Sequence, residues 1–309
     1  MAIQNIQVTN DVTFNRSLYI GGSDIAAVLG KSRYKTPYRL WCEKTGRIEN
    51  TISNLEAVNF GTELEEFVAQ TFSKRANKPV RKAPKGYQHP DYPYMVAHVD
   101  RLITGSDELL ECKTCSAYKL DEWQNAIPKE YILQVIWYLG ITKRKRGWIA
   151  CLIGGQKFDY KYIDFDDELF KLMVEKAKEF YQMVQTDTPP LIMPDDDETL
   201  GEVYKIHSDD LIEAQEFDDR IAYLQELKMH RDDMNAEIKE IETELKAKIG
   251  ENLGISTDKY KVTWKTQTTS RLDTDKLREE IAEIDNFYIK KSYRVLRITK
   301  NKEKEQENV

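Results

Sequence analysis

Apolar residues recur along the first two thirds of the chain with two different periods. Three segments carry them at the spacing of an amphipathic helix: residues 60–72, 128–140 and 166–184. Between these segments lie shorter apolar runs bounded by turn residues. They predict two hairpins, one from residues 99–102 and 109–114, the other from residues 148–153 and 158–163 across Gly154-Gly155. The order helix, strands, helix, strands, helix predicts an α/β (α+β) domain.

The last third of the chain has a different pattern. Prolines and acids mark a linker at residues 191–207, which separates a domain of residues 1–190 from an arm of residues 208–299. A long helix with a broken heptad-like stripe is expected at residues 208–249. A small αβ unit should follow, made of strand 261–267, a helix opened by Asp273 and a basic strand 288–299; the polar tail 300–309 should be disordered. The arm either packs on itself or serves oligomerisation or partner docking.

Charge is spread unevenly over the 309 residues, whose net charge is −7. This balance argues against a simple DNA-binding protein. Residues 1–194 nevertheless carry 26 basic against 24 acidic residues, and the remainder carries 20 against 29. Two basic clusters, within residues 73–88 and at residues 143–146, could neutralise phosphates, or they could be solvated loops.

Composition also limits the cellular setting. No apolar run reaches membrane-spanning length, and the start Met1-Ala2-Ile3-Gln4 lacks the pattern of a signal peptide, so a cytoplasmic protein is expected. The pair Cys112 and Cys115 forms a CxxC, but no second CxxC or finger-spaced histidine accompanies it. Buried, unpaired structural cysteines are therefore favoured over a zinc or redox site, and no disulfide is expected.

The first hairpin carries the candidate chemistry. Glu111 and Lys113 are two apart on one strand and so share a face, and the hairpin can bring Asp100 beside them. Carboxylates suit hard cations such as Mg²⁺, and a lysine can hold a phosphate or a water. This arrangement is typical of metal-dependent phosphodiester cleavage. The alternative is an ordinary hairpin that ends in solvated charges.

Further polar residues accompany the predicted helices. Glu65 flanks the apolar face of the helix at residues 60–72, and Gln134 is a lone amide in the stripe of the helix at residues 128–140. Near the N-terminus, Ser23 opens a helix whose first turn could bind an anion, and Arg16 favours a phosphate there. Aromatic residues near Arg33, namely Tyr34, Tyr38 and Trp41, could contact DNA, although such a stripe is more often helix core.

Taken together, residues 16–165 resemble the PD-(D/E)xK nucleases, and within them the YqaJ-type viral recombinases related to phage lambda exonuclease. The helix glutamate of that family matches Glu65 through the spacing Gly61-x-x-x-Glu65. Its metal-binding aspartate matches Asp100, although His98-Val99 precedes it where Ser-Pro is usual. Its remaining motif positions match Glu111, Lys113, Gln134, Arg16 and Ser23.

The resemblance implies a nuclease core with a mixed sheet flanked by helices, and a mechanism. Asp100, Glu111 and the backbone carbonyl of Cys112 would hold one Mg²⁺, for which Mn²⁺ could substitute. Glu65 would help to hold a second ion. Lys113 would orient the water, and deprotonate it if its pKa were lowered, while Gln134 would position the water or the phosphate. Arg16 and Ser23 would bind the 5′-phosphate. Arg33 is a further candidate for DNA binding because it lies near the aromatic residues, and no family motif implies it.

The resemblance also implies 5′→3′ resection of duplex DNA ends for a single-strand annealing recombinase, by a phage- or prophage-encoded enzyme of a bacterial host. A homo-oligomer, a trimeric ring, is implied as well. Two rival functions stay open: a DNA endonuclease of the same fold, and a non-catalytic DNA-binding scaffold.

Overall fold

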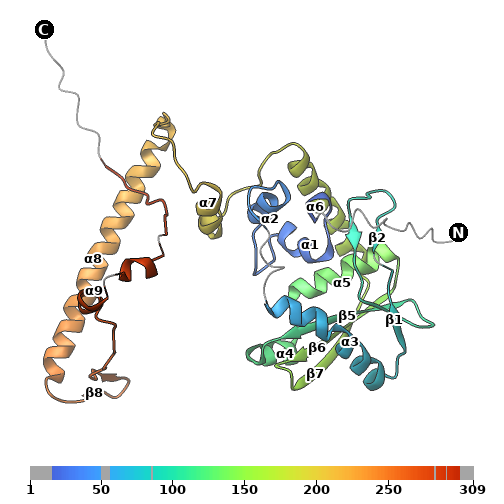
Figure 1. Ribbon diagram of the computed structural model, residues 1–309, viewed down its shortest axis with the longest axis horizontal. Helices are drawn as coiled ribbons and strands as arrows, with labels where there is room; N and C mark the ends of the chain where they lie inside the picture. The colour runs from blue at the N-terminus through green and yellow to red at the C-terminus, as the bar shows by residue number, and fades with distance from the viewer. Residues whose placement is uncertain (1–15, 50–55, 85, 282, 290, 300–309) are drawn as a thin grey trace, which may run out of the picture. The chain divides into compact units, whose positions relative to one another are not determined.

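A computed structural model describes residues 16–49, 56–84, 86–281, 283–289 and 291–299 (Figure 1). Residues Ile206–Tyr293 form one compact unit, and the described residues on either side of them belong to the other. The predicted tail 300–309, the chain start and Lys85 lie outside the described residues.

The first unit is built on a five-stranded mixed sheet. Its strands, in spatial order, are β1 (Val80–Lys82), β4 (Arg101–Ile103), β5 (Glu108–Cys115), β6 (Arg146–Ile153) and β7 (Lys157–Asp164). Strands β5 and β6 are parallel and the other neighbours antiparallel. Helix α5 (Lys129–Thr142) supplies the crossover that a parallel pair requires. Both predicted hairpins and the α/β class are confirmed. A second, two-stranded sheet pairs β2 (Tyr87–Gln88) with β3 (Val96–Ala97).

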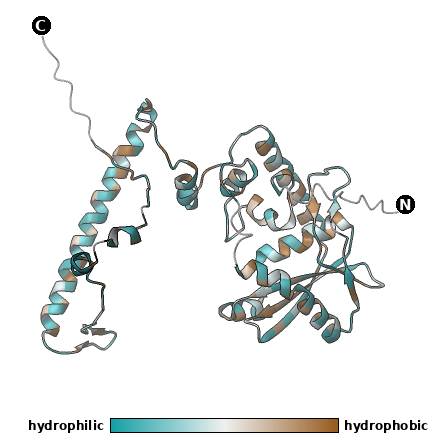
Figure 2. Ribbon diagram, viewed as in Figure 1, coloured by the Kyte–Doolittle hydropathy of each residue, from teal (hydrophilic) through white to brown (hydrophobic). Residues whose placement is uncertain are grey.

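Helices cover both faces of this sheet (Figure 1). Helix α3 (Glu56–Ala76) packs on one face, where Leu110 and Cys112 point. Leu109 points to the other face, which is covered by α1 (Gly22–Val28), α2 (Pro37–Lys44), α5 and α6 (Asp167–Gln185). Figure 2 shows hydrophobic residues along α5 and the strands that it covers. Since side chains alternate along β5, Glu111 and Lys113 face α5, whereas Cys112 enters the opposite core as predicted.

Local signals set the ends of these helices. Asp166 caps α6 by accepting a hydrogen bond from the backbone N–H of Leu169 at 2.9 Å. Lys143 ends α5 in the left-handed conformation, with φ 53°. The three helices predicted at residues 60–72, 128–140 and 166–184 are confirmed, and α3 is longer than the periodicity indicated because its first turn is exposed and carries little pattern.

The second unit contains α8 (Asp218–Ile249), β8 (Gly254–Ser256), β9 (Lys261–Thr263) and α9 (Thr274–Glu280). The predicted start of the long helix at residue 208 is wrong: residues 208–214 are not helical, since Ser208, Asp209 and Asp210 favour turns and caps. The strand predicted at residues 288–299 is absent from the described residues there, because no neighbouring strand pairs with it. Most of the predicted stripe is exposed: Phe217, which directly precedes α8, and Ile221, Met234, Ile238 and Ile241 on α8.

The segment predicted as an acidic linker has structure of its own. It contains the 3₁₀ turn η4 (Pro194–Asp196) and helix α7 (Asp197–Val203). The buried Asp196 accepts a hydrogen bond from the Thr36 hydroxyl, and Arg39 of α2 pairs with Glu202 at 3.0 Å. The segment is therefore docked on α2 and belongs to the first unit.

Because residues 191–205 are docked on the first unit, a truncation after Lys205 should be tolerated better than one after Pro190. A chain ending after Lys205 should remain soluble and melt near the full-length temperature. A chain ending after Pro190 lacks Asp196, the partner of the Thr36 hydroxyl, and Glu202, a partner of Arg39. The loss of about 1–3 kcal/mol for such a contact should lower its Tm by roughly 3–10 °C. Thermal unfolding of the two truncations measures the difference, and equal Tm values would contradict it.

Candidate active site

Four polar side chains meet on the α5 face of the sheet. Lys113 donates hydrogen bonds to Glu111 Oε1 at 2.7 Å and to Gln134 Oε1 at 3.0 Å. The amide nitrogen of Gln134 donates to the same Glu111 oxygen at 2.8 Å and to the Tyr138 hydroxyl at 2.8 Å. Strand β5 supplies the first two residues, and α5 supplies the others one helical turn apart, so the crossover unit itself builds the cluster.

Asp100 joins this cluster from the residue just before β4. Its Oδ2 accepts a hydrogen bond from the backbone N–H of Cys112 at 2.7 Å, which ties the carboxylate to the middle of β5. Burial and the neighbouring Glu111 carboxylate hold the pKa of Asp100 well above its usual value. The carboxylates of Asp100 and Glu111 thus lie close together, and the single positive charge of Lys113 does not fully offset their repulsion.

The donor set fits a divalent cation. Glu111 Oε2 is buried and has no hydrogen-bond partner, which is costly for a carboxylate oxygen. A cation would satisfy that oxygen and relieve the repulsion between Glu111 and Asp100. Carboxylate and carbonyl oxygens are the ligands that Mg²⁺ prefers, and the backbone of Cys112 lies beside both carboxylates.

Lys113 lies against two carboxylates, which affect its pKa. Its burial disfavours the charge, but Glu111 and Asp100 outweigh burial, and the pKa of Lys113 lies above its ordinary value. The raised pKa favours the charged form of Lys113, and its action as a base stays a prediction. The side chain is therefore an ammonium group that can donate hydrogen bonds.

Glu65 is held differently from the other acids. Arg101, directly after Asp100, is buried and donates to the carboxylates of Glu65 and, at 2.9 Å, Glu66. Within the part of the chain that the structure describes, no three His, Cys, Asp or Glu side chains are grouped closely enough to hold a metal ion. Glu65 is thus near Asp100, but its partner here is Arg101.

The N-terminal pair lies beside the cluster. Arg16 donates to the Ser23 hydroxyl at 2.9 Å, and the binding of a phosphate by this pair stays a prediction. The backbone of Arg16 is held by Lys44, a buried lysine that donates to the backbone carbonyls of Arg16 and Tyr19 at 2.6 Å and to Asp24 at 2.8 Å. The buried ammonium group is thus compensated at three points, and it fixes the turn that carries Arg16.

Arg33 is not brought to this pocket. Its guanidinium is bound by two carboxylates, those of Glu122 and Glu130. Of the neighbouring aromatic residues, Tyr38 and Trp41 are buried in the core, and Tyr34 is exposed.

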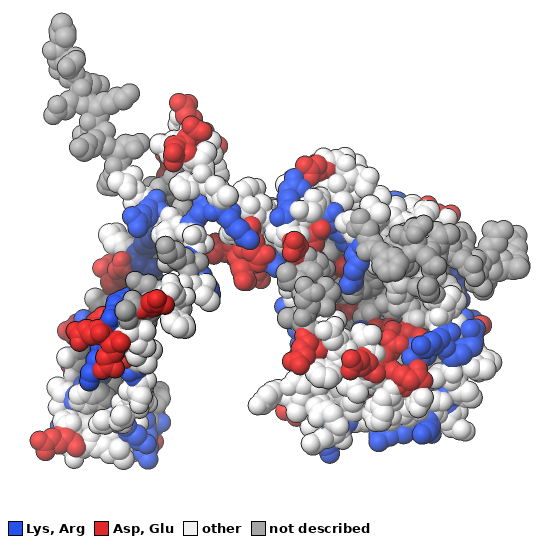
Figure 3. Space-filling view, in the orientation of Figure 1, with Lys and Arg blue, Asp and Glu red and all other residues white. Residues whose placement is uncertain are grey.

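The remaining polar candidates are structural or dispersed. Cys42, Cys112, Cys115 and Cys151 are free. His98 packs on the Tyr19 ring at 5.4 Å between centroids, and burial lowers its pKa. Several members of the basic clusters are paired, for example Lys78 with Glu108 and Arg146 with Asp164. Figure 3 shows basic and acidic side chains close together on the visible face of this unit.

No helix among the described residues is long and apolar enough to cross a bilayer.

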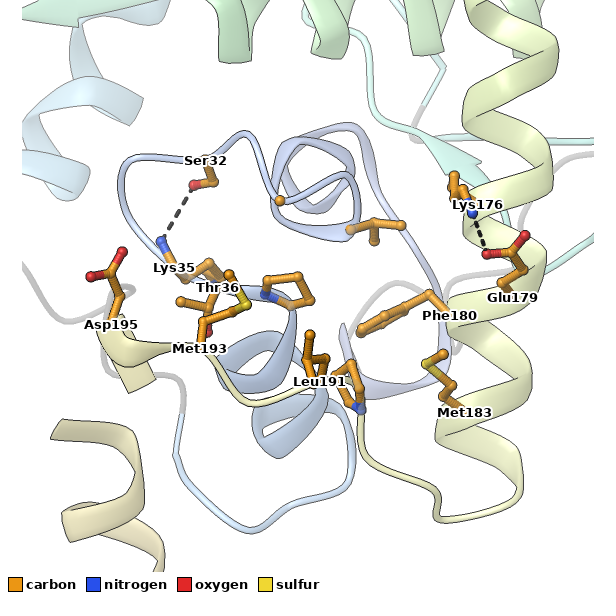
Figure 4. Close-up of a pocket in the computed structure, with 14 residues that line it drawn as sticks. Ser32, Lys35, Thr36, Lys176, Glu179, Phe180, Met183, Leu191, Met193 and Asp195 are labelled. Atoms are coloured by element: carbon orange, nitrogen blue, oxygen red, sulfur yellow. Dashed lines mark hydrogen bonds and ion pairs between the residues drawn. The ribbon is translucent and has the colours of Figure 1, made fainter. Parts of the chain in front are cut away.

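A cavity of about 340 Å³ lies away from the acidic cluster (Figure 4). It is lined by α1, α2, α6 and the segment around Leu191, and its lysines are engaged: Lys35 pairs with Glu43, and Lys176 with Glu179. Its lining does not include Asp100, Glu111, Lys113, Gln134 or Tyr138.

Three residues of this region escaped the sequence analysis: Lys44, Arg101 and Tyr138. Arg101 adjoins Asp100, and Tyr138 follows Gln134 by one helical turn, so their positions offered a signal. Lys44 offered none, since its partners lie 20 or more residues away.

Known proteins resemble this chain over most of its length. Residues 14–145 match the model of the YqaJ-like viral recombinase domain. The uncharacterized protein YqaJ of Bacillus subtilis is 35% identical over 279 residues, 86% of each chain. An alkaline exonuclease from Laribacter hongkongensis has 19% identity and a TM-score of 0.49 over 58% of this chain and 94% of its own. A putative exonuclease from Eubacterium rectale has 12% identity and a TM-score of 0.46 over 69% and 98%. The 35% identity to YqaJ, sustained over 86% of both chains, shows that this protein belongs to the YqaJ-like viral recombinase family.

Proposed function

We propose that this protein is a Mg²⁺-dependent exonuclease that degrades linear duplex DNA from 5′ ends and leaves single strands for an annealing recombinase. The observation that carries the proposal is the pair of the part-buried Asp100 and the buried Glu111, which has an unsatisfied carboxylate oxygen and lies beside Lys113. The adjacent Arg16–Ser23 pair supports action at an end, because a guanidinium can bind a terminal phosphate through two hydrogen bonds.

The chain's own residues suggest how hydrolysis proceeds. Asp100, Glu111 and the Cys112 carbonyl would hold a divalent ion, and Glu65 would help to hold a second after releasing Arg101. When bound, such ions supply Lewis-acid stabilisation of the charge on the reacting phosphate. Lys113, as an ammonium group, donates hydrogen bonds to the attacking water or the phosphate. Gln134 holds Lys113 and Glu111 in register through its three hydrogen bonds to the cluster.

The exposed apolar stripe of α8 supports a further part of the proposal. Large exposed apolar surfaces mark sites of association. The arm would therefore serve self-assembly or docking of the annealing protein. Light scattering of the full chain and of the Lys205 truncation measures the contribution of the arm to assembly.

Three DNA substrates test the function. Linear and covalently closed duplexes, the linear ones with either a 5′-phosphate or a 5′-hydroxyl, are incubated with Mg²⁺ or with EDTA. Linear 5′-phosphorylated DNA that carries a label at its 5′ end should release the labelled nucleotide in Mg²⁺, and EDTA should stop this release. Cleavage of closed circles at a comparable rate would support the endonuclease instead, and binding without any cleavage would support the scaffold.

Replacing Arg16 by alanine should reduce the preference for 5′-phosphorylated over 5′-hydroxyl ends. A hydrogen bond to a charged group contributes about 1.5–3 kcal/mol, so the kcat/KM ratio of the two substrates should fall roughly 10- to 100-fold. Arg47→Ala is the matched control, because Arg47 pairs with Asp187 instead. An unchanged ratio in a folded Arg16→Ala variant would remove Arg16 from the phosphate pocket.

A further inference from the structure

Tyr138 lies between the first turn of α1, which carries Ser23, and the cluster formed by Asp100, Glu111, Lys113 and Gln134. It lies on α5 and is only 4% exposed. A Cβ atom at Gly22 would come within 2.4 Å of Tyr138 Cε1 and 2.9 Å of Cζ, so the first turn of α1 rests directly on the phenol ring near its hydroxyl. Ser23, which binds Arg16, is the next residue of that turn.

The hydrogen bonds of the cluster leave one donor unsatisfied, the hydroxyl hydrogen of Tyr138. Both amide hydrogens of Gln134 are used, one by Glu111 and the other by the Tyr138 oxygen, and its carbonyl accepts from Lys113. Gln134 therefore has no donor left for DNA. Since the Tyr138 oxygen is the acceptor in its bond to Gln134, its own hydrogen must seek another partner.

That partner is missing from the described residues. No hydrogen bond from the Tyr138 hydroxyl to any of them is formed, and Glu111 Oε2, the unsatisfied oxygen of the cluster, does not accept one. A buried donor without an acceptor costs free energy. An acceptor that arrives with the substrate would remove this cost.

We infer that the Tyr138 hydroxyl donates a hydrogen bond to a non-bridging phosphate oxygen at the first internucleotide linkage of the DNA end. This inference rests on the proposed exonuclease function and adds a DNA-contacting residue to it. The linkage to be cleaved lies one nucleotide from the terminal phosphate. Tyr138 lies between the residues that would hold that phosphate, Arg16 and Ser23, and the carboxylates that would bind the ion.

Stereospecific sulfur substitution tests this contact. Duplexes carry a 5′-phosphate and one phosphorothioate, of Rp or Sp configuration, at the first linkage. Single-turnover rates are measured in Mg²⁺ for the wild type, Tyr138→Phe and the control Tyr38→Phe, which alters another buried tyrosine of the same core. Sulfur accepts hydrogen bonds more weakly than oxygen, so one isomer loses the contact.

Tyr138→Phe should slow cleavage of the all-oxygen duplex roughly 10-fold, about the loss of one hydrogen bond to a charged group. One isomer should slow the wild type more than the other does, and this difference should shrink by a similar factor in Tyr138→Phe but not in Tyr38→Phe. A slower Tyr138→Phe enzyme with an unchanged isomer difference would show that the hydroxyl acts only through Gln134, and would overturn the inference. The absence of any isomer difference in the wild type would overturn it as well, without reference to a variant.

A binding experiment separates this inference from the function beneath it. Fluorescence anisotropy in EDTA measures the affinity of the same duplexes without hydrolysis, and the isomer preference of the wild type should again be lost in Tyr138→Phe. No hydrolysis by the wild type, with this binding pattern present, overturns the exonuclease function alone. Hydrolysis by the wild type, with the isomer preference unchanged in Tyr138→Phe, overturns the role of Tyr138 alone.

Discussion

Replacement of Glu111 by glutamine is expected to abolish Mg²⁺-dependent DNA cleavage while leaving the protein folded. The amide keeps the shape of the side chain and can still accept from Lys113, but it removes the charge that would bind the ion. Metal-ion catalysis contributes several kcal/mol, so kcat should fall by about 10³-fold or more. The rate of nucleotide release from linear duplex DNA, measured at saturating DNA and Mg²⁺, checks this expectation.

A matched variant on the same strand controls for the fold. Glu108 also lies on β5 and pairs with Lys78 outside the cluster, so Glu108→Gln should retain activity. Metal binding has its own readout, because an ion that binds only the folded protein raises stability by about 2.7 kcal/mol at 100 times its Kd. Mn²⁺ or Mg²⁺ should therefore raise the Tm of the wild type and of Glu108→Gln, but not that of Glu111→Gln. A folded Glu111→Gln enzyme with near-normal activity would show that the metal site is elsewhere.

Replacement of Lys113 by alanine should lower turnover strongly and change DNA affinity little. The ammonium group is held against Glu111 and Gln134, and its raised pKa keeps it charged. Its effect should therefore be electrostatic, on charge that grows in the transition state, and losing one such donor costs about 10²- to 10³-fold in kcat. Single-turnover kinetics and anisotropy on the same duplex give the rate and the affinity separately.

Lys78→Ala is the control for this experiment, because Lys78 also pairs with a glutamate of β5. That variant should keep the wild-type rate. A Lys113→Ala enzyme that binds DNA weakly but turns over normally at saturation would make Lys113 a phosphate contact without a role in the chemical step.

Local sequence patterns sufficed for much of the nuclease unit. The alternation along β5 placed Glu111 and Lys113 on one face and Cys112 on the other, because side chains of a strand alternate whatever the strand packs against. The helical spacing of apolar residues found α5 and α6 for a similar reason, since each buries one stripe against a core. In the arm the same approach failed at residues 208–214, where Ser208, Asp209 and Asp210 favour turns and caps. It also failed in the described part of residues 288–299, where no neighbouring strand pairs with the predicted one.

The sequence by itself determined which residue types make up the proposed active site and which strand or helix presents each of them. Only the tertiary structure decided their partners. In the fold, Glu65 forms an ion pair with Arg101, and Arg33 forms ion pairs with Glu122 and Glu130. Tyr138 accepts a hydrogen bond from Gln134 and packs against Gly22. The physical reason is that helix and strand periods are set by backbone geometry over a few residues, whereas ion pairs and pKa values depend on charges that the fold brings together from distant positions. The pKa of Lys113, for example, is raised because Glu111 and Asp100 are folded against it.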